Sequence, residues 1–416
     1  MRIAYVVPYA PNRIRTRSYN LILQLVSLGH EVTVFTLGSN KEEWIDAQSL
    51  KNYCREVYFY TQPVWRSIVN SAVALPSRKP LQSVYSWQPA MAQEIVQRAS
   101  RDEFDIVHIE HLRGSRFGLF LKSRMPNMPI VWDSVDCISH LFQQAAKQSR
   151  SFFGKFMTRL ELSRTRRAEG DLACRFDHVL VTSPSDQKAL RGLVSSGNSP
   201  AEISVLPNGV DLEYFHPSAD VQRDPETIVF SGKMSYHANV SMAKYLVDEI
   251  MPRIWEGRPA ARLYIVGKDP TPTIKKMARN PLITVTGTID DIRPFLWRAT
   301  VSVVPLLYGA GIQNKILEAM STGTPVVTTR QALSALQAQP GKDIFVSDDT
   351  DGFAQAVLQL IENRELQQKT GEAGVAYVRT FHSWTSIASQ LVNVYQQVLS
   401  RNSGEVAGLV PLLKHV

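Results

Sequence analysis

The chain has 416 residues, of which 44% are hydrophobic and 20% are charged, and its formal net charge is +8. This length exceeds what one hydrophobic core usually supports, so two domains are expected. The composition is ordinary for a soluble globular protein and favours no specialised class.

The cysteines and the N-terminus bear on the compartment. Cys54, Cys137 and Cys174 are widely spaced and form no metal-like or redox-like pair, which favours a reducing, cytoplasmic setting over a disulfide framework. We expect Cys137 to be a small buried apolar residue. The N-terminus, MRIAYVVPYAPN, has too short an apolar run for a signal peptide. No stretch is apolar for long enough to span a bilayer, so any contact with the inner membrane surface would be peripheral.

The positive charge is compatible with nucleic acid, an anionic membrane surface or an anionic substrate. The densest basic segment is residues 147–176, where aromatic and aliphatic residues alternate with arginines at roughly helical spacing. It is either a helix with a solvated basic face or a surface for a membrane or an anionic acceptor. No nucleic-acid-binding motif accompanies it, so nucleic acid is not an expected partner.

Strands and helices alternate along the first half of the chain. A strand at 2–7 is followed by a helix at 18–30 and a strand at 31–37. Further strands are expected within 104–112, 128–136 and 177–185, as in a parallel sheet with helices on both faces. Residues 65–87 fit this pattern poorly, and we expect a flap over the acceptor side there.

The pattern restarts after a stretch rich in proline and glycine at 206–225. Strands are expected within 227–234, 262–269, 283–289, 301–307 and 324–329, with helices between them. The fold class is therefore α/β, with two Rossmann-like, doubly wound parallel-sheet domains. Ligands bind beyond the carboxyl ends of the strands in such sheets, so we expect the substrates in a cleft between the domains.

The segment YGAGIQNKILEAMSTGTPVV, residues 308–327, combines a small-residue turn with an amphipathic helix. Lys315 and Glu318 are three residues apart and share a helix face. The N–H groups of residues 310–313 are free donors at the helix start, which suits a phosphate with a hydroxylated group beside it. The alternative is an ordinary surface pair on an exposed helix.

Several motifs together resemble the retaining glycosyltransferases of family 4, which have the GT-B fold. The matching pieces are LPNGVDLEYFHP, VFSGKM, VGKDP and GAGIQNKILEAMSTGTPVV, in that order. HSWTSIASQLVNVYQQVL is similar to the family's closing helices, which cross back onto the first domain. The resemblance implies an N-terminal acceptor domain at 1–210, a linker at 211–225, a nucleotide-sugar domain at 226–378, and a returning helix with a tail at 379–416.

The N-terminal half resembles a bacterial subgroup related to sugar transferases of exopolysaccharide-type gene clusters. The pieces that carry this resemblance are NRIRTRSYN, DIVHIEHLRG, VWDSVDCIS and DHVLVTSPSDQKAL. The subgroup places a basic loop after the first strand, where Arg13, Arg15 and Arg17 are candidates to dock an anionic acceptor. A solvated loop is the alternative.

The donor site departs from the family pattern in two places. The family's pair of glutamates falls on Ala310 and Glu318, so only the glutamate that accepts hydrogen bonds from the ribose is kept. Lys233 stands where the family has an arginine against the diphosphate, and SYHAN lacks the second cation, for which Lys315 is the candidate replacement. The expected donor-binding residues are Gly232, Lys233, Gly267, Ala310, Gly311, Ile312, Gln313, Lys315 and Glu318.

The expected chemistry follows from the charge that develops when the sugar–phosphate bond breaks. Lys233, Lys315 and the helix N–H groups would stabilise the departing phosphate, with no metal and no other cofactor. Asp290 and Asp291 follow a strand directly and are predicted to form a turn and a helix cap. By the resemblance, the anomeric configuration is retained. The expected donor is a uridine diphosphate sugar, the commonest donor in the family, and a guanosine diphosphate sugar is the alternative.

His111 and Asp136 follow two strands of the first domain and are candidates to contact the donor sugar or the acceptor. A structural histidine and a helix-capping aspartate are the alternatives, and Glu110 and Asp133 share the same turns. The expected partners are thus a nucleotide sugar and a glycan, lipid-linked or small-molecule acceptor. Two other functions stay open: a sugar-nucleotide epimerase of the same fold, and a scaffold that binds nucleotide sugar without turnover.

Overall fold

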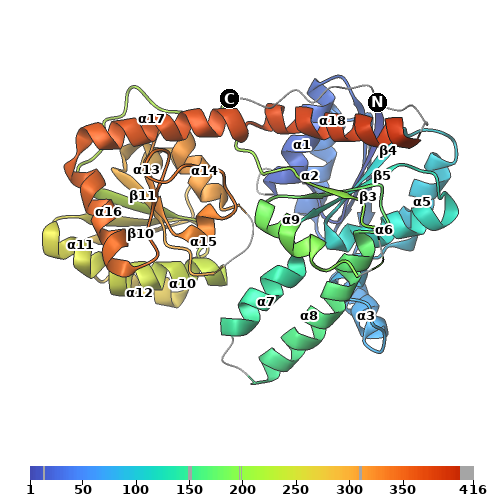
Figure 1. Ribbon diagram of the computed structural model, residues 1–416, viewed down its shortest axis with the longest axis horizontal. Coiled ribbons are helices and arrows are strands. Elements are labelled where there is room, and N and C mark those ends of the chain that lie inside the picture. The colour runs from blue at the N-terminus through green and yellow to red at the C-terminus, as the bar shows by residue number, and fades with distance from the viewer. Residues whose placement is uncertain (13–14, 149–151, 196, 198, 309–311, 403–416) are drawn as a thin grey trace. The chain divides into compact units, whose positions relative to one another are not determined.

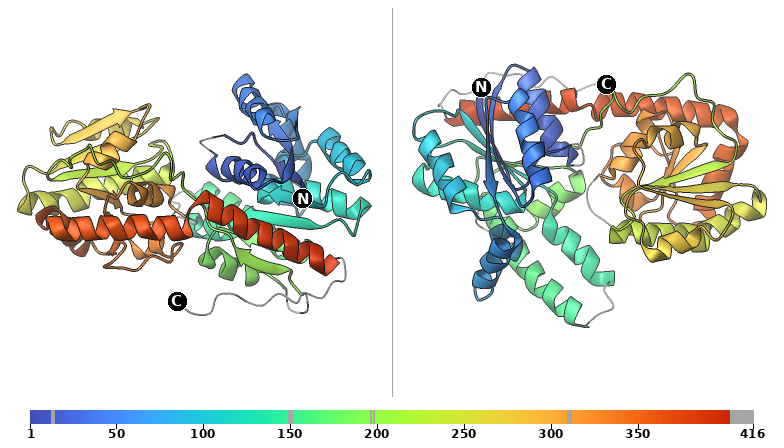
Figure 2. Two further views of the ribbon diagram at one scale, coloured as in Figure 1. Left: turned by 90° about the horizontal axis from the view of Figure 1, so that it is seen from above. Right: turned by 180° about the vertical axis from the view of Figure 1, so that it is seen from behind.

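In the computed structural model, the described residues are 1–12, 15–148, 152–195, 197, 199–308 and 312–402. They form two compact units (Figure 1). The N-terminal unit comprises Met1–Leu206 and the chain from Ile387 on, and the C-terminal unit comprises Pro207–Ser386. Each unit is a parallel sheet with helices on both faces (Figure 2), so the predicted pair of doubly wound domains is confirmed.

The sheet of the N-terminal unit has seven strands in the order β3-β2-β1-β4-β5-β6-β7. The order reverses between β1 and β4, which is where ligands bind in open sheets of this kind. Its strands are β1 (Arg2–Val7), β2 (Glu31–Gly38), β3 (Glu56–Thr61), β4 (Ile106–Glu110), β5 (Ile130–Val135), β6 (His178–Val181) and β7 (Glu202–Val205).

The core of the N-terminal unit, which includes buried Trp132 and Phe117, lies between this sheet and its helices. Local sequence sets their starts: the hydroxyl of Ser183 accepts a hydrogen bond from the N–H of Asp186, and Pro184 begins α9. The helices are α1 (Thr16–Ser27), α2 (Lys41–Ser49), η1 (Leu50–Asn52), α3 (Val64–Ala74), α4 (Leu81–Tyr85), α5 (Pro89–Ala99), α6 (His111–Arg124), α7 (Ile138–Gln148), α8 (Phe152–Leu172), α9 (Pro184–Arg191) and most of α18 (Trp384–Asn402).

The sheet of the C-terminal unit has six strands in the order β10-β9-β8-β11-β12-β13, and its order reverses between β8 and β11. The strands are β8 (Thr227–Ser231), β9 (Arg262–Val266), β10 (Ile283–Gly287), β11 (Val301–Val304), β12 (Val326–Thr328) and β13 (Phe345–Val346). The helices are α10 (His237–Tyr245), η2 (Leu246–Ile250), α11 (Met251–Gly257), α12 (Pro272–Met277), α13 (Arg293–Arg298), α14 (Asn314–Ser321), α15 (Arg330–Leu333), α16 (Thr350–Glu362) and α17 (Arg364–Phe381).

The structure adds detail to two predicted segments. Residues 65–87 hold most of α3 and all of α4, and their role as a flap over the acceptor side stays a prediction. Residues 211–225, expected as a linker, lie against the C-terminal unit: the Arg223 guanidinium donates 2.6 Å hydrogen bonds to the carbonyls of Ala299 and Gly323. We find no helix with the length and hydropathy of a membrane span among the residues that the structure describes.

Candidate functional site

The loops after β8 and β9 approach each other closely because glycines occupy both. Gly232 and Gly267 have φ angles of +144° and +141°, which L side chains rarely adopt. A Cβ atom on Gly267 would lie 1.9 Å from the carbonyl oxygen of Gly232. A Cβ atom on Gly232 would lie 2.8 Å from Nδ2 of Asn239 and 3.0 Å from Nζ of Lys315. The glycines thus leave room for two polar side chains directly beneath the loop.

Lys315 lies in the first turn of α14 and is only 8% exposed. Its Nζ atom donates a 2.7 Å hydrogen bond to Oδ1 of Asn239 and lies 4.7 Å from the ring centroid of Phe230. Burial lowers the pKa of Lys315 to about 7, although the charge of Glu318 opposes the shift. No carboxylate forms an ion pair with Lys315 in the part of the chain that is described. The side-chain hydrogen-bond partner of Lys315 is therefore a neutral amide and not a carboxylate.

Glu318 lies one turn further along α14 and is half-buried. Burial raises the pKa of its carboxyl group to about 6, and the charge of Lys315 opposes this shift. The alternative of an exposed surface pair for Lys315 and Glu318 does not fit this burial. A ligand hydroxyl beside Glu318 would favour its ionised form, because the carboxylate is then a pure acceptor.

The remaining predicted donor residues lie nearby or outside the described residues. Ile312 is buried, and Gln313 precedes α14 as its N-cap residue. Ala310 and Gly311 fall outside the described residues. Lys233 follows Gly232, and its carbonyl accepts a 2.8 Å hydrogen bond from Nδ2 of Asn239. The Lys233 side chain is 56% exposed, with Nζ 3.7 Å from Oδ2 of Asp269, so a ligand could reach it.

Asn239 is a site residue that the sequence reasoning did not identify. It occupies the first turn of α10 and is 7% exposed. Its amide bridges the Lys315 ammonium group and the Lys233 carbonyl, which joins α14 to the loop after β8. Asn239 is the last residue of SYHAN. The sequence analysis considered this segment only for the second cation that it lacks.

In the N-terminal unit, Glu110 and Asp133 lie inside a buried polar network and are both fully buried. The hydroxyl groups of Tyr5 and Tyr9 donate hydrogen bonds to the Glu110 carboxylate. Burial raises the pKa of Glu110 to about 7. Asp133 accepts a 2.9 Å hydrogen bond from Nε of Arg17. These two carboxylates therefore hold the ends of β1, β4 and β5 together.

His108 and Tyr395 complete this network, and sequence reasoning missed both. Nε2 of His108 lies 3.7 Å from Oδ2 of Asp133, and Nδ1 of the same ring lies 2.8 Å from the Tyr395 hydroxyl. Tyr395 belongs to α18, so the contact ties the closing helix to the strand ends of the N-terminal unit. His108 and Tyr395 are 287 residues apart, so no local sequence pattern predicts their contact.

His111 is less buried than its neighbour Glu110, and Asp136 is less buried than Asp133. His111 has a φ angle of +66°, and Val135, just before Asp136, has one of +67°. Such angles cost conformational energy in residues with a Cβ atom and cluster at functional sites. Burial lowers the pKa of His111 to about 4 and raises that of Asp136 to about 6, the latter with help from the charge of Asp186. His111 is thus neutral near pH 7 and is suited to hydrogen bonding rather than to carrying charge.

The predicted arginines have different environments. We expected Arg17 on the loop after the first strand, but it lies in the first turn of α1. It is only 6% exposed, and its guanidinium pairs with the buried Asp133 carboxylate at 2.8 Å. Arg15 precedes α1, pairs with Glu43 at 3.0 Å and remains partly exposed. Arg13 falls outside the described residues.

Two further observations concern carboxylates and metals. Asp291 lies two residues before α13, whose N-cap residue is Ile292, and accepts hydrogen bonds from the backbone and side chain of Arg293 and from Tyr214. No group of three or more histidine, cysteine, aspartate or glutamate side chains is placed to hold a metal ion among the described residues.

Two family profiles match consecutive parts of the chain. "Glycosyltransferase Family 4" matches residues 14–214, and "Glycosyl transferases group 1" matches residues 225–363. The MMP alpha-(1->4)-mannosyltransferase of Mycolicibacterium hassiacum is 22% identical over 407 residues, which cover 92% of this chain and 94% of the relative. The phosphatidyl-myo-inositol mannosyltransferase of Mycolicibacterium smegmatis is 24% identical over 420 residues, covering 96% and 94%.

Solved structures with the same fold include two whose sequences differ widely from this one. Sucrose-phosphate synthase from Thermosynechococcus elongatus has a TM-score of 0.67 at 19% identity, over 96% of this chain and 99% of that one. Anabaena HepE in complex with UDP has a TM-score of 0.67 at 14% identity, over 95% and 100%. The profiles, the relatives and the two parallel sheets agree: the chain is a glycosyltransferase of the GT-B type, with a family 4 domain followed by a group 1 domain.

Proposed function

We propose that the protein transfers a hexose-type sugar from a nucleotide diphosphate donor, with retention of anomeric configuration and without a metal ion. The observation that carries this proposal is the enclosed Lys315 ammonium group, which has a neutral hydrogen-bond partner in Asn239. A buried cation without a paired anion is costly, and a diphosphate would supply that anion. Glu318 lies one helical turn away, where it could accept hydrogen bonds from the ribose.

In the proposed reaction, the bond between the anomeric carbon and the diphosphate oxygen breaks first. Lys315, Lys233 and the N–H groups at the start of α14 stabilise the negative charge on the departing phosphate. The acceptor hydroxyl then attacks from the face that the phosphate leaves. The phosphate takes the proton of that hydroxyl, so no separate protein base is required.

The donor is proposed to be a UDP-sugar, because Anabaena HepE, which shares the fold, has been solved with UDP and with UDP-glucose. The acceptor is proposed to be a bacterial glycan, a lipid-linked sugar or a small molecule at the inner face of the cytoplasmic membrane. The relative from Mycolicibacterium smegmatis is named for a phosphatidyl-myo-inositol acceptor, which supports the lipid-linked option. Membership of the exopolysaccharide-type subgroup stays a prediction.

A thermal-shift screen with UDP, GDP and ADP tests the donor part of this proposal. A ligand that binds only the folded state raises the melting temperature as its saturation increases. We expect UDP to raise it in the parent protein and to raise it much less in Lys315→Ala. No shift with any of the three nucleotides would contradict the proposal.

Ala310 favours one second candidate, a scaffold that binds nucleotide sugar without turnover, because a family glutamate is absent there. The scaffold would give the same thermal shift but no sugar transfer. A transfer assay therefore separates the two functions.

A further inference from the structure

Helix α3 in the N-terminal unit exposes its apolar side. Trp65 is 65% exposed and Val73 is 74% exposed. Their spacing with Ile68 and Val69 places all four on one helix face. The exposed apolar residues of this segment are Val64, Trp65, Ile68, Val69, Val73 and Leu75. A contiguous apolar surface of this kind is typical of an interaction site.

The opposite, polar side of α3 holds the helix in place. Nε2 of Gln62 lies 3.3 Å from the Ser67 hydroxyl and from the Tyr85 carbonyl, to both of which it donates hydrogen bonds. Nδ2 of Asn70 donates a 3.0 Å hydrogen bond to the carbonyl of Trp87. Surface helices normally bury their apolar side and expose the polar one. This reversal indicates that the apolar side of α3 serves a partner rather than the core.

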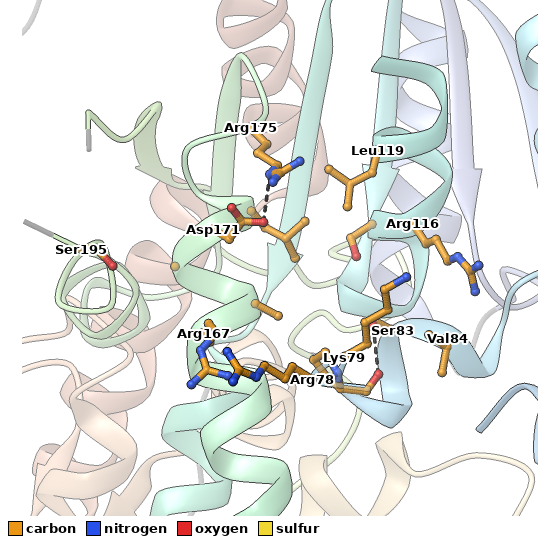
Figure 3. Close-up of a pocket in the computed structure, with 15 residues that line it drawn as sticks. Arg78, Lys79, Ser83, Val84, Arg116, Leu119, Arg167, Asp171, Arg175 and Ser195 are labelled. Atoms are coloured by element: carbon orange, nitrogen blue, oxygen red, sulfur yellow. Dashed lines mark hydrogen bonds and ion pairs between the residues drawn. The ribbon is translucent and has the colours of Figure 1, made fainter. Parts of the chain in front are cut away.

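A basic pocket of about 520 Å³ lies between α4, α6 and α8 (Figure 3). Asp171 and Arg175 at its rim pair with each other at 2.9 Å. The Arg116 guanidinium stacks on the ring of Trp87, which does not line the pocket, at 4.2 Å from the ring centroid. The other three cations, Arg78, Lys79 and Arg167, have no carboxylate partner in the described part of the chain. Unpaired cations around a cavity of this size suit a phosphate group.

The apolar face of α3 and the basic pocket belong to one piece of structure. Arg78 follows Leu75, the last exposed apolar residue, by three positions. The Arg164 guanidinium on α8 donates a 2.6 Å hydrogen bond to the carbonyl of Leu75. The Glu161 carboxylate on α8 accepts a 3.0 Å hydrogen bond from the N–H of Leu81. Figure 1 shows α3 and α8 extending from the same end of the N-terminal unit.

We propose that this surface docks on an anionic lipid bilayer, with the apolar side of α3 in the headgroup layer and a lipid phosphate in the basic pocket. Aliphatic residues with a tryptophan, directly followed by lysine and arginine, match the apolar and anionic parts of such a surface. The inference goes beyond sugar transfer and does not depend on the donor site.

Flotation of the full chain with vesicles is the first test. We expect binding to vesicles of phosphatidylcholine with phosphatidylglycerol, and little binding to phosphatidylcholine alone. Binding should weaken as salt is raised, because screening reduces the attraction between exposed charges.

Two pairs of variants then test the surface itself. The pocket variant Arg78→Gln/Lys79→Gln/Arg167→Gln should reduce vesicle partitioning roughly 100-fold, since each cation at an anionic surface contributes about fivefold. Its control, Lys275→Gln/Lys276→Gln/Lys342→Gln, removes the same charge from exposed lysines of the C-terminal unit. The α3 variant Trp65→Ser/Val73→Ser should also lose binding, whereas Phe381→Ser/Leu28→Ser, at exposed apolar positions elsewhere, should not.

The following outcomes would overturn the inference. Equal losses in the pocket variant and its control would show that only net charge matters. Full binding by the α3 variant would remove α3 from the membrane contact. Glycerol 3-phosphate that binds through the pocket, with no vesicle binding by the parent, would assign the pocket to a soluble phosphate ester. Circular dichroism and the melting temperature without ligand confirm that each variant is folded, so these results are separable from the proposed donor chemistry.

Discussion

The ammonium group of Lys315 donates a 2.7 Å hydrogen bond to the side-chain oxygen of Asn239 in the C-terminal unit. This contact links the first turn of α14 to the first turn of α10. Asn239 is neutral, so it orients the lysine without balancing its charge. In the proposed reaction, the diphosphate of the donor balances this charge.

Replacing Lys315 with alanine should reduce turnover more than donor affinity, because the charge matters most when the diphosphate departs. By analogy with a lost oxyanion donor, the loss is on the order of 2–4 kcal/mol, or about 30- to 1,000-fold in kcat. Lys233→Ala should act in the same direction, and the double variant should fall short of the sum since both cations serve one phosphate group. Steady-state kinetics with the preferred donor measures this. If the Lys315→Ala enzyme turns over like the parent, the lysine is not needed, and the turn before α14 must hold the phosphate by itself.

The pKa of Lys315, about 7 in the free protein, predicts how donor affinity depends on pH. The diphosphate binds the protonated lysine, so the affinity of the parent for UDP should fall as the pH rises through about 7. In Asn239→Asp, a carboxylate beside the ammonium group should raise the lysine pKa and flatten the profile, with weaker binding below pH 7. Titration calorimetry between pH 6 and pH 9 measures both profiles, with the helix-cap variant Asn363→Asp as control. An unchanged profile in Asn239→Asp would show that Lys315 does not contact the diphosphate.

Glu318→Gln should weaken donor binding while the fold stays intact. The substitution preserves shape but removes the charge that accepts the ribose hydroxyl protons, a loss of roughly 1.5–3 kcal/mol. The exposed variant Glu365→Gln serves as a matched control, and binding of UDP measures the difference. Equal affinities for the two variants would remove Glu318 from the site.

Gly267→Ala should destabilise the C-terminal unit strongly, because the added Cβ atom would lie 1.9 Å from the carbonyl oxygen of Gly232. Gly287→Ala is the control: its φ angle is +72°, but nothing lies within 4 Å of the added atom. We expect a loss of about 1 kcal/mol at Gly287 and of more than about 2 kcal/mol at Gly267. Urea unfolding followed by tryptophan fluorescence measures both free energies. Similar losses would mean that backbone conformation alone, and not the close approach, requires Gly267.

Sugar transfer should survive EDTA, because lysines and helix N–H groups take the phosphate charge in the proposed reaction. The assay compares rates in chelator with rates in added Mg²⁺ or Mn²⁺. Loss of activity in EDTA that either metal restores would show that a cation completes the donor site.

Much of the fold was predictable because its central strands are continuous apolar runs. The runs at Arg2–Val7, Thr227–Ser231 and Val301–Val304 lie within the predicted ranges. The edge strands β3, β7 and β13 were not predicted. For β7 and β13, runs of four and two residues give no periodic signal. Helices α3 and α4 were missed because α3 is polar toward the protein and apolar toward solvent.

The site was predictable only where its parts are close in sequence. The spacing of Lys315 and Glu318 indicated a shared helix face, but their burial was not apparent. The contact between Lys315 and Asn239 spans 76 residues and leaves no local trace. Arg17 was misread because its partner Asp133 is 116 residues away. Glu110 and His111 are adjacent, and only the left-handed backbone at His111 separates the buried residue from the more exposed one.

The central claim is sugar transfer from a donor held by Lys315 and Glu318, and a radiolabel transfer assay tests it most directly. The parent and the double variant Lys315→Ala/Glu318→Gln are each incubated with a panel of labelled UDP- and GDP-sugars, with bacterial membrane extract as acceptor. The account predicts a labelled product from at least one UDP-sugar with the parent, in the anomeric configuration of the donor, and none above background with the double variant. No product from any donor with the parent, or equal product with the double variant, would contradict it.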